Sequence, residues 1–306
     1  MNRRAFLAAT ACAAVTATPA WAVRRSAVTP PADLGVQLWM VRQSMAHDLE
    51  GTLARLAALG VRRVELAGAP ERPAAELRAA LDAAGLACVS GHLPLLQITD
   101  TEAERQFAFA AALGMRTVIA PTPGRADLLE LAPDARLAAL IARPLAADDW
   151  RWNADRLNVL GDRARAAGLA VGYHNHNVEF AEVEGQTGMS LMLARVDPTM
   201  AHFQLDVGNA VLGGADPLAL LQNWPDRFRS GHLKDWRRPL TPTTRLTSPP
   251  SAPYGEGVVD WRAWRAASAQ AELETSFIER ENLPAEDEVA GVAQALSYFA
   301  ALQRGA

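Results

Sequence analysis

Cysteine is scarce in this chain of 306 residues, which contains only Cys12 and Cys88. Cys12 falls in a segment that we expect to be removed, so the mature protein can form no internal disulfide. No internal apolar run approaches the roughly 20 residues of a membrane helix. The formal net charge is only −4, which argues against a surface for nucleic acids. These absences favour a globular protein held together by its apolar core.

The first 22 residues predict a targeting segment (1–22). Arg3 and Arg4 precede an alanine-rich apolar stretch, and residues 20–22 are typical of a signal-peptidase site. The segment resembles a twin-arginine export signal. We therefore expect a periplasmic or exported protein without a membrane span in its mature form, with residues 23–33 as a linker.

After the linker, one pattern recurs: a helical stretch rich in Ala and Leu, a glycine, and a short β-like run. Gly60, Gly85, Gly114 and Gly168 occupy the glycine position, where a helix C-terminus favours left-handed backbone. Alternating helices and strands indicate a parallel sheet. We predict an α/β fold, a single-domain (β/α)8 TIM barrel over residues 34–304, with strands near Gly35–Trp39, Arg63–Ala67, Ala87–His92, Thr117–Pro121, Ala170–His176, His202–Asp206, Ser230–Lys234 and Ser276–Arg280.

Two connections are longer than the others, at residues 121–149 after the fourth strand and 237–261 after the seventh. Both follow the carboxyl end of a predicted strand, where the active-site loops of such a barrel lie. We therefore expect both of them beside the functional site.

Reactive side chains of a parallel barrel gather at the carboxyl ends of its strands. Four of the six histidines fall there, and charged or imidazole groups in apolar strands are costly unless they are paired or ligated. We therefore predict a functional site from the polar and aromatic residues at these ends, which are Gln37, Trp39, Glu65, His92, His174, His176, Asp206, His232, Lys234 and Glu279.

A subset of these residues has the composition of a metal site. His174 and His176 are two apart and would share a face of an extended strand. Asp206, His232 and Glu279 end the next three predicted strands. One histidine together with these three is an N2O2 set, which suits Mn²⁺, Zn²⁺, Co²⁺ or Fe²⁺ better than Ca²⁺ or a thiolate-bound metal.

Five short motifs, which follow one another along the chain, carry a resemblance to a known family. The chain resembles the xylose-isomerase-like TIM barrels, the sugar phosphate isomerase/epimerase group, over roughly Leu34 to Leu302. The motifs are Tyr173–Phe180, Gln204–Asn209, Gly231–Asp235, Gly255–Trp261 and Ile278–Glu281.

The resemblance implies one divalent metal ion held from strands 5 to 8, with Asp206, His232 and Glu279 as ligands. The fifth-strand ligand is often Glu in relatives, whereas this strand ends in two histidines. That leaves His176, His174 or, third, Glu179. We assign His176 as the ligand and His174 as the acid/base, and expect Mn²⁺, with Zn²⁺, Co²⁺ or Fe²⁺ as alternatives.

The resemblance also implicates Glu65, His92 and Lys234 in the substrate pocket. Gln37 and Asn209 are further candidates for substrate binding, and Trp39 and Trp236 for stacking on a sugar face. Asn209 stands where DNA-cutting relatives tend to have another metal-binding histidine, which favours a mononuclear site.

Together these features predict a metal-dependent isomerase or epimerase. A base, His174 or Glu65, would remove the proton next to a carbonyl to give an enediolate held on the metal, and Lys234 would donate to the developing oxyanion. The chain has no phosphate-binding glycine loop, so we expect a non-phosphorylated sugar or keto-sugar. We expect no nucleic-acid partner, and an oligomer is compatible with the sequence.

Three alternatives stay open. The same site could serve a lyase or hydratase that acts on 3-keto-glycosides or cyclitols. A metal-dependent nuclease or hydrolase is disfavoured by the mild acidity and by Asn209. A non-catalytic sugar-binding barrel would bind no metal.

Overall fold

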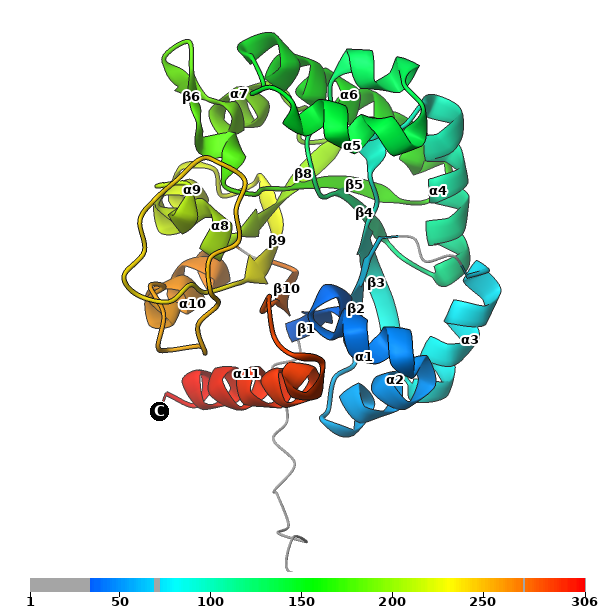
Figure 1. The fold of residues 1–306 in the computed structure, drawn as a ribbon, viewed down its shortest axis with the longest axis vertical. Helices are drawn as coiled ribbons and strands as arrows, with labels where there is room; N and C mark the ends of the chain where they lie inside the picture. The colour runs from blue at the N-terminus through cyan, green and yellow to red at the C-terminus, as the bar shows by residue number, and fades with distance from the viewer. Residues whose placement is uncertain (1–33, 69–71, 272, 306) are drawn as a thin grey trace, which may run out of the picture.

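The computed structural model describes residues 34–68, 72–271 and 273–305, and the predicted export signal and linker lie outside this part of the chain. Eight parallel strands form a closed barrel in the order β1-β10-β9-β8-β5-β4-β3-β2 (Figure 1). The predicted TIM barrel is therefore confirmed. Its strands are β1 (Leu34–Gln37), β2 (Arg63–Ala67), β3 (Ala87–His92), β4 (Thr117–Ala120), β5 (Ala170–His174), β8 (Ala201–Asp206), β9 (Phe228–Leu233) and β10 (Thr275–Ile278).

Helices surround the barrel on its outside (Figure 1). None of the described helices is both long and apolar enough to cross a membrane. They are α1 (Arg42–His47), α2 (Leu49–Ala58), α3 (Ala74–Ala84), α4 (Asp100–Leu113), α5 (Pro133–Ile141), α6 (Ala147–Ala166), α7 (Gly188–Arg195), α8 (Val207–Leu212), α9 (Pro217–Asn223), α10 (Trp261–Gln270) and α11 (Glu288–Gln303).

The four glycines of the recurring pattern all have positive φ, as predicted. Gly85 and Gly114 cap α3 and α4 in the left-handed region, and Gly60 and Gly168 have φ of 92° and 73°. A residue with a Cβ is strained in this conformation. These glycines therefore end helices and direct the chain back into strands β3, β4, β2 and β5.

The strands end earlier than their polar residues suggested. β1 stops at Gln37, so Trp39 lies in a 3-10 helix (Leu38–Val41) instead of the strand. β5 stops at His174, whose pairing partner on β8 is Gln204, so His176 lies beyond the strand. Lys234 and Glu279 each follow directly after their strands. The prediction that the fifth strand reaches His176 is wrong, because pairing with β8 stops at His174.

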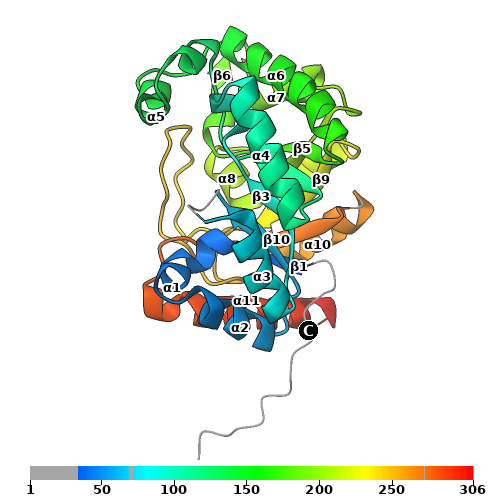
Figure 2. The same ribbon diagram turned by 90° about the vertical axis from the view of Figure 1, so that its right-hand side faces the viewer.

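Both long connections lie at the carboxyl ends of the strands, as predicted. The first contains a 3-10 helix (Ala126–Glu130) and α5. The second, which we call the long loop (residues 237–257), has no helix or strand of its own and is joined to Trp236 by a bridge at Ser251. Figure 2 shows the long loop on the same side of the barrel as α1 and α5. A short antiparallel pair, β6 (Glu182–Val183) and β7 (Gln186–Thr187), was not expected.

Candidate active site and metal centre

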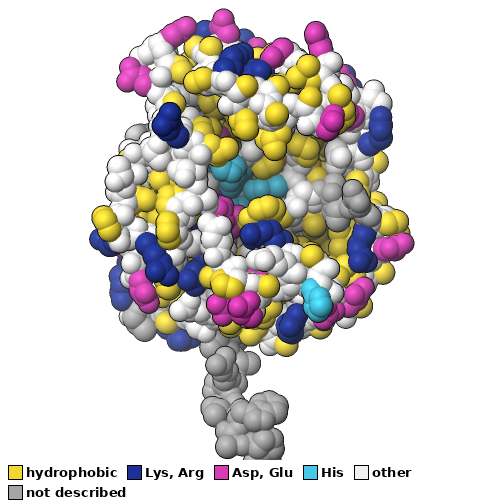
Figure 3. Space-filling model, in the orientation of Figure 1, with side chains coloured by type: hydrophobic (Ala, Val, Ile, Leu, Met, Phe, Trp, Pro, Cys, Tyr) yellow, Lys and Arg dark blue, Asp and Glu magenta, His cyan; other side chains and the backbone are white. Residues whose placement is uncertain are grey.

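A hollow opens at the centre of the face on which the strands end, and histidine side chains with an acidic neighbour lie in it (Figure 3). The polar residues predicted at the strand ends converge there. Glu65, His174, Asp206, His232, Lys234 and Glu279 are all buried, and His92 and His176 are half-buried. A buried polar cluster of this size requires partners for each member.

Glu65, on β2, accepts hydrogen bonds from four other side chains around the site. Its Oε1 accepts hydrogen bonds from Gln37 Nε2 (2.9 Å) and His232 Nε2 (2.5 Å). Its Oε2 accepts from Ser90 Oγ (2.5 Å) and Gln204 Nε2 (2.8 Å). Burial favours its neutral form, but the neighbouring His92 and His232 outweigh burial and hold the pKa of Glu65 well below its usual range. The fully paired carboxylate is better suited to holding its neighbours in place than to accepting a proton.

Gln204, on β8, orients two histidines. Because its Nε2 donates to Glu65, its Oε1 faces His92 Nε2 at 2.8 Å and His174 Nδ1 at 3.1 Å. Gln204 was not among the predicted site residues, although the strand period of two places it on the same face as Asp206. Ser90 was missed as well.

The predicted metal ligands Asp206, His232 and Glu279 form a second part of the cluster. One ligand atom from each of Asp206, His232 and Glu279 lies within 4.8 Å of the other two. His232 Nδ1 lies 2.9 Å from Glu279 Oε2. In a second group, one ring nitrogen from each of His92, His174 and His232 lies within 4.8 Å of the other two. Burial opposes the charge of His232, but the carboxylates of Glu65 and Glu279 raise its pKa to about 10.

Lys234 balances the negative charge of the carboxylates around the predicted metal ligands. Its Nζ lies 3.1 Å from Asp206 Oδ2, 3.0 Å from Glu279 Oε2 and 2.7 Å from Glu281 Oε1. Burial would lower the pKa of Lys234, yet these three carboxylates raise it well above its usual range. Burial raises the pKa of Asp206, whereas Lys234 and His232 overcome burial and lower that of Glu279.

The two histidines of the fifth-strand motif differ in their contacts. His174 Nε2 lies 3.6 Å from Asp206 Oδ2, whereas His176 Nδ1 is buried without a hydrogen-bond partner. Their ring centroids are 5.1 Å apart. Burial lowers the pKa of both, well below the usual range for His174 and to about 4 for His176. Both imidazoles are therefore neutral near pH 7 in this arrangement.

The donor set fits a divalent cation. His174 is neutral and its Nδ1 faces the oxygen of Gln204, so the ring proton lies on Nδ1. Its Nε2 then directs a lone pair toward the Asp206 carboxylate, 3.6 Å away. Asp206 Oδ2 is paired with Lys234 and Asn209, and a divalent cation placed between it and His174 Nε2 would be attracted to both electron-rich atoms. Imidazole nitrogens with carboxylate oxygens suit Mn²⁺, Fe²⁺, Co²⁺ or Zn²⁺.

The remaining predicted residues lie around this centre. Asn209 is next to it, because its backbone N–H and its side-chain amide both donate to Asp206, each at 2.8 Å. Trp236 is fully buried and its indole donates to Gly208 O, so its ring is part of the packing. Trp39 is 44% exposed and stacks on Arg42. Glu179 is buried and accepts from Tyr173 OH at 2.6 Å.

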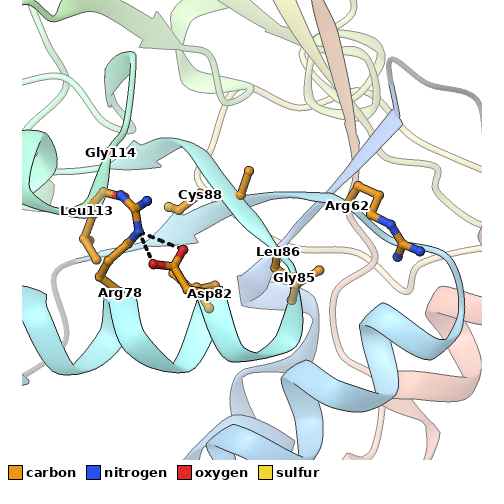
Figure 4. A pocket seen from close by; sticks show the side chains of 10 residues that line it. Arg62, Arg78, Asp82, Gly85, Leu86, Cys88, Leu113 and Gly114 are labelled. Atoms are coloured by element: carbon orange, nitrogen blue, oxygen red, sulfur yellow. Dashed lines mark hydrogen bonds and ion pairs between the residues drawn. The ribbon is translucent and has the colours of Figure 1, made fainter.

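A separate cavity of about 280 Å³ lies at the opposite end of the barrel, where β3 and β4 begin. Arg62, Arg78 and Cys88 are among its lining residues, and Arg78 is paired with Asp82 (Figure 4). None of the predicted site residues lines this cavity.

The closed barrel and its site define the class of protein. It is a TIM barrel that carries a buried cluster of histidines and carboxylates where its strands end. The family model described as Xylose isomerase-like TIM barrel matches residues 53–300. The chain therefore belongs to the xylose isomerase-like TIM barrel family, as the sequence motifs predicted.

Individual relatives share less with this chain. An inosose dehydratase from Lacticaseibacillus casei is 33% identical over 91 residues, which is 30% of this chain and 30% of that protein. The match thus spans less than a third of this curated relative.

Solved structures share the fold over most of their length. A sugar phosphate isomerase/epimerase from Parabacteroides distasonis is 24% identical, with a TM-score of 0.69 over 88% of this chain and 93% of that one. A xylose isomerase-like TIM barrel protein from Mycobacterium smegmatis, solved in complex with magnesium, is 18% identical, with a TM-score of 0.61 over 92% and 98%. At these identities the likeness concerns the fold.

Proposed function

We propose that this protein is a divalent-metal-dependent isomerase or epimerase that acts next to the carbonyl of a non-phosphorylated sugar or keto-sugar. The observation that carries the proposal is the buried convergence of Asp206, His232 and Glu279 beside His176, whose Nδ1 has no hydrogen-bond partner. When bound, the cation would polarise the substrate carbonyl and acidify the adjacent C–H. We expect Mn²⁺, with Zn²⁺, Co²⁺ or Fe²⁺ as alternatives.

The contacts favour exchanging the roles first assigned to the two histidines. We propose His174 as the fifth-strand ligand, because its Nε2 faces Asp206 and its Nδ1 is held by Gln204. His176 is then the acid/base, because its Nδ1 has no partner and can accept a proton. His92 and His174 are both held by Gln204, which supports an orienting role for that amide.

In this mechanism His176 removes the proton from the carbon next to the carbonyl, and the electron pair moves onto the carbonyl oxygen. The Lys234 ammonium stabilises that developing negative charge. For an isomer, His176 returns the proton to the former carbonyl carbon, while the proton of the adjacent hydroxyl moves to the former carbonyl oxygen and the new carbonyl forms. For an epimer, the intermediate turns over in the site before His176 returns the proton to the opposite face of the original carbon. Glu65 holds His232, Gln204 and Ser90 in place and is not the base.

A dehydratase is the second candidate, favoured by the partial likeness to inosose dehydratase. The first step is the same proton removal by His176. If the substrate, a keto-glycoside or an inosose-like cyclitol, has a β-hydroxyl group, the electron pair can expel it instead. The C–O bond to that hydroxyl breaks, and the proton held by His176 leaves with the hydroxide as water.

The experiment is an NMR screen in D₂O with the Mn²⁺-loaded protein and a panel of keto-sugars, cyclitols and 3-keto-glycosides. Deuterium incorporation with an isomeric product supports the first proposal, and loss of water supports the second. Glu279→Gln is expected to abolish stoichiometric metal binding and, with it, deuterium exchange and loss of water. The exposed-site control Glu286→Gln is expected to retain metal binding and catalysis. Ligand binding without exchange or metal uptake would instead indicate a non-catalytic sugar-binding protein.

We also propose export through the twin-arginine pattern at Arg3 and Arg4. An exported enzyme would meet free sugars, in agreement with the absence of a phosphate-binding glycine loop from the sequence. Cell fractionation of the wild-type chain and of an Arg3→Lys/Arg4→Lys variant tests this, since the variant is expected to remain in the cytoplasm.

A further inference from the structure

Lys234 holds the two carboxylate oxygens that the proposed cation needs. Its Nζ lies 3.1 Å from Asp206 Oδ2 and 3.0 Å from Glu279 Oε2. The same Asp206 Oδ2 is the oxygen that His174 Nε2 faces, and the same Glu279 Oε2 is the oxygen next to His232 Nδ1. A divalent cation at this position therefore has to displace the ammonium from these two oxygens.

Glu281 is the one carboxylate on Lys234 that lies outside the proposed ligand set. Its Oε1 is 2.7 Å from Lys234 Nζ, the shortest of the three contacts. The Lys234 side chain is only 2% exposed, so the ammonium needs a buried or half-buried counter-ion wherever it moves. Glu281 supplies a counter-ion that the cation does not use.

Glu281 also contacts the long loop. Ser248 Oγ donates to the second carboxylate oxygen of Glu281, and Ser251 Oγ donates to its backbone O at 2.7 Å. On the other side of the site, Asn177 Nδ2 donates to Thr243 O (2.7 Å) and to Arg245 O (2.8 Å). The loop is thus attached beside the fifth-strand motif and beside Glu281.

We propose that Glu281 is a positioning residue that retains the Lys234 ammonium when a divalent cation takes the carboxylates of Asp206 and Glu279, and that Ser248 couples this exchange to the long loop. The inference rests on the proposed metal-dependent function. Glu281 itself does not contact the cation; it acts through Lys234.

The test is calorimetric titration of the metal-free chain with Mn²⁺. Glu281→Gln is expected to weaken Mn²⁺ binding about tenfold, within the usual range of coupling between sites, because Lys234 then competes for Asp206 and Glu279 without an alternative partner. Glu281→Asp keeps the charge but shortens the side chain, and it is expected to weaken binding to a similar degree. Glu256→Gln, an exposed change on the same loop, leaves affinity unchanged.

A thermodynamic cycle with Lys234→Gln separates retention of the ammonium from simple attraction between Glu281 and the cation. In that background, Glu281→Gln is expected to change the affinity less than twofold. An equal loss in both backgrounds, or wild-type affinity in Glu281→Asp, would overturn the proposal. If circular dichroism shows that the Lys234 variants are unfolded, the Mn²⁺ affinity of Glu281→Asp alone decides whether the proposal holds.

Amide hydrogen exchange provides a readout of the coupling to the loop. Addition of Mn²⁺ is expected to change exchange in residues 243–252 of the wild-type chain but not of Ser248→Ala, while both variants bind the ion. An identical response in the two overturns the coupling. If the wild-type chain binds no Mn²⁺, Zn²⁺, Co²⁺ or Fe²⁺, the proposed function itself fails, which distinguishes that outcome from failure of the Glu281 inference.

Discussion

His174 and His176 are chemically identical side chains, and their different contacts suggest different roles. His174 is enclosed by Gln204 and Asp206, whereas His176 has a nitrogen without a partner. A ligand must be oriented before the metal binds, whereas an acid/base must reach the substrate. Neither property follows from sequence position, because a spacing of two predicts the same face for both residues, whereas β5 ends at His174 and His176 lies beyond it.

Substitution of each histidine separates the two roles. His174→Gln is expected to lower Mn²⁺ affinity by at least about tenfold, because a metal ligand is lost. His176→Gln is expected to retain the metal within a factor of two and to lose about 10²–10⁴-fold in turnover, because a general base is lost. Calorimetry and the D₂O exchange assay check the two effects. The reverse pattern would restore the assignment made from the sequence.

His202, on β8 at the other end of the barrel, predicts a pH dependence of stability. Burial, helped by Arg229, lowers its pKa from the usual 6.5 to about 4. Between these values the unfolded chain binds more protons than the folded one, so stability falls as pH decreases from about 6.5 to about 4. The loss expected is of the order of 1–3 kcal/mol.

Urea unfolding at pH 7 and pH 4.5 measures this effect. His202→Gln is expected to show a smaller decrease over this range than the wild-type chain, even if its stability at pH 7 is lower. Equal decreases in the two proteins would show that other groups cause the acid sensitivity.

At the scale of elements, the sequence predicted the strands well and their ends less well. The glycines at the helix C-termini mark the returns to β2, β3, β4 and β5 by their left-handed backbone, so these βα units could be predicted from a local signal. The helices before β8, β9 and β10 have Val196, Trp224 and Ala271 at their C-caps, without such a glycine. Strand ends depend on where the neighbouring strand stops pairing, which is a long-range property. This is why the fifth strand ends at His174 and not at His176.

Helix α6 supports a prediction in which a normally favourable change becomes harmful. Alanine is usually preferred over glycine inside a helix by roughly 0.5–1 kcal/mol. A Cβ on Gly161 would lie 2.1 Å from Met200 O, a backbone atom that cannot rotate away. Gly161→Ala is therefore expected to destabilise the fold by about 1–3 kcal/mol in urea unfolding.

Gly291, in α11, provides a matched control. A Cβ there would meet the end of the Leu283 side chain at 2.6 Å, and that side chain can shift. Gly291→Ala is expected to cost less than Gly161→Ala. If both alanine variants are as stable as the wild type, close approach to backbone does not determine the position of α6.

At the scale of the whole molecule, closure of the barrel joins the two ends of the described chain. Helix α11 lies beside α1 and α2 (Figures 1 and 2). The buried Glu288 carboxylate of α11 accepts from the backbone N–H groups of Gln43 (3.2 Å) and Ser44 (2.8 Å) in α1. One side chain thus caps a helix that lies 245 positions away in the sequence.

Loss of this contact should affect the entire fold. Glu288→Ala leaves two backbone donors without partners in a partly buried place, which costs about 1–3 kcal/mol. Urea unfolding of this variant and of the exposed control Glu286→Ala measures the difference. A stability equal to the control would mean that water replaces the carboxylate at no cost.

Closure also explains which site residues could be predicted. Asp206, His232 and Glu279 lie within one residue of the ends of consecutive strands. The strand ends of a barrel meet on one face, so the proximity of these residues follows from topology. Gln204 could have been found by counting back two positions from Asp206. Glu281 could not, because it lies beyond β10, where no periodicity relates sequence position to direction.

Cys88 has a practical consequence for following the motions of the barrel. Its thiol is buried at the start of β3, and burial raises its pKa to about 12, which suppresses the reactive thiolate. Once Cys12 is replaced by serine, Cys88 is the single thiol of the chain. Because Cys88 lines the cavity beside α3, its rate of labelling by a disulfide reagent then reports how often the packing around that cavity opens, and can be measured with and without Mn²⁺.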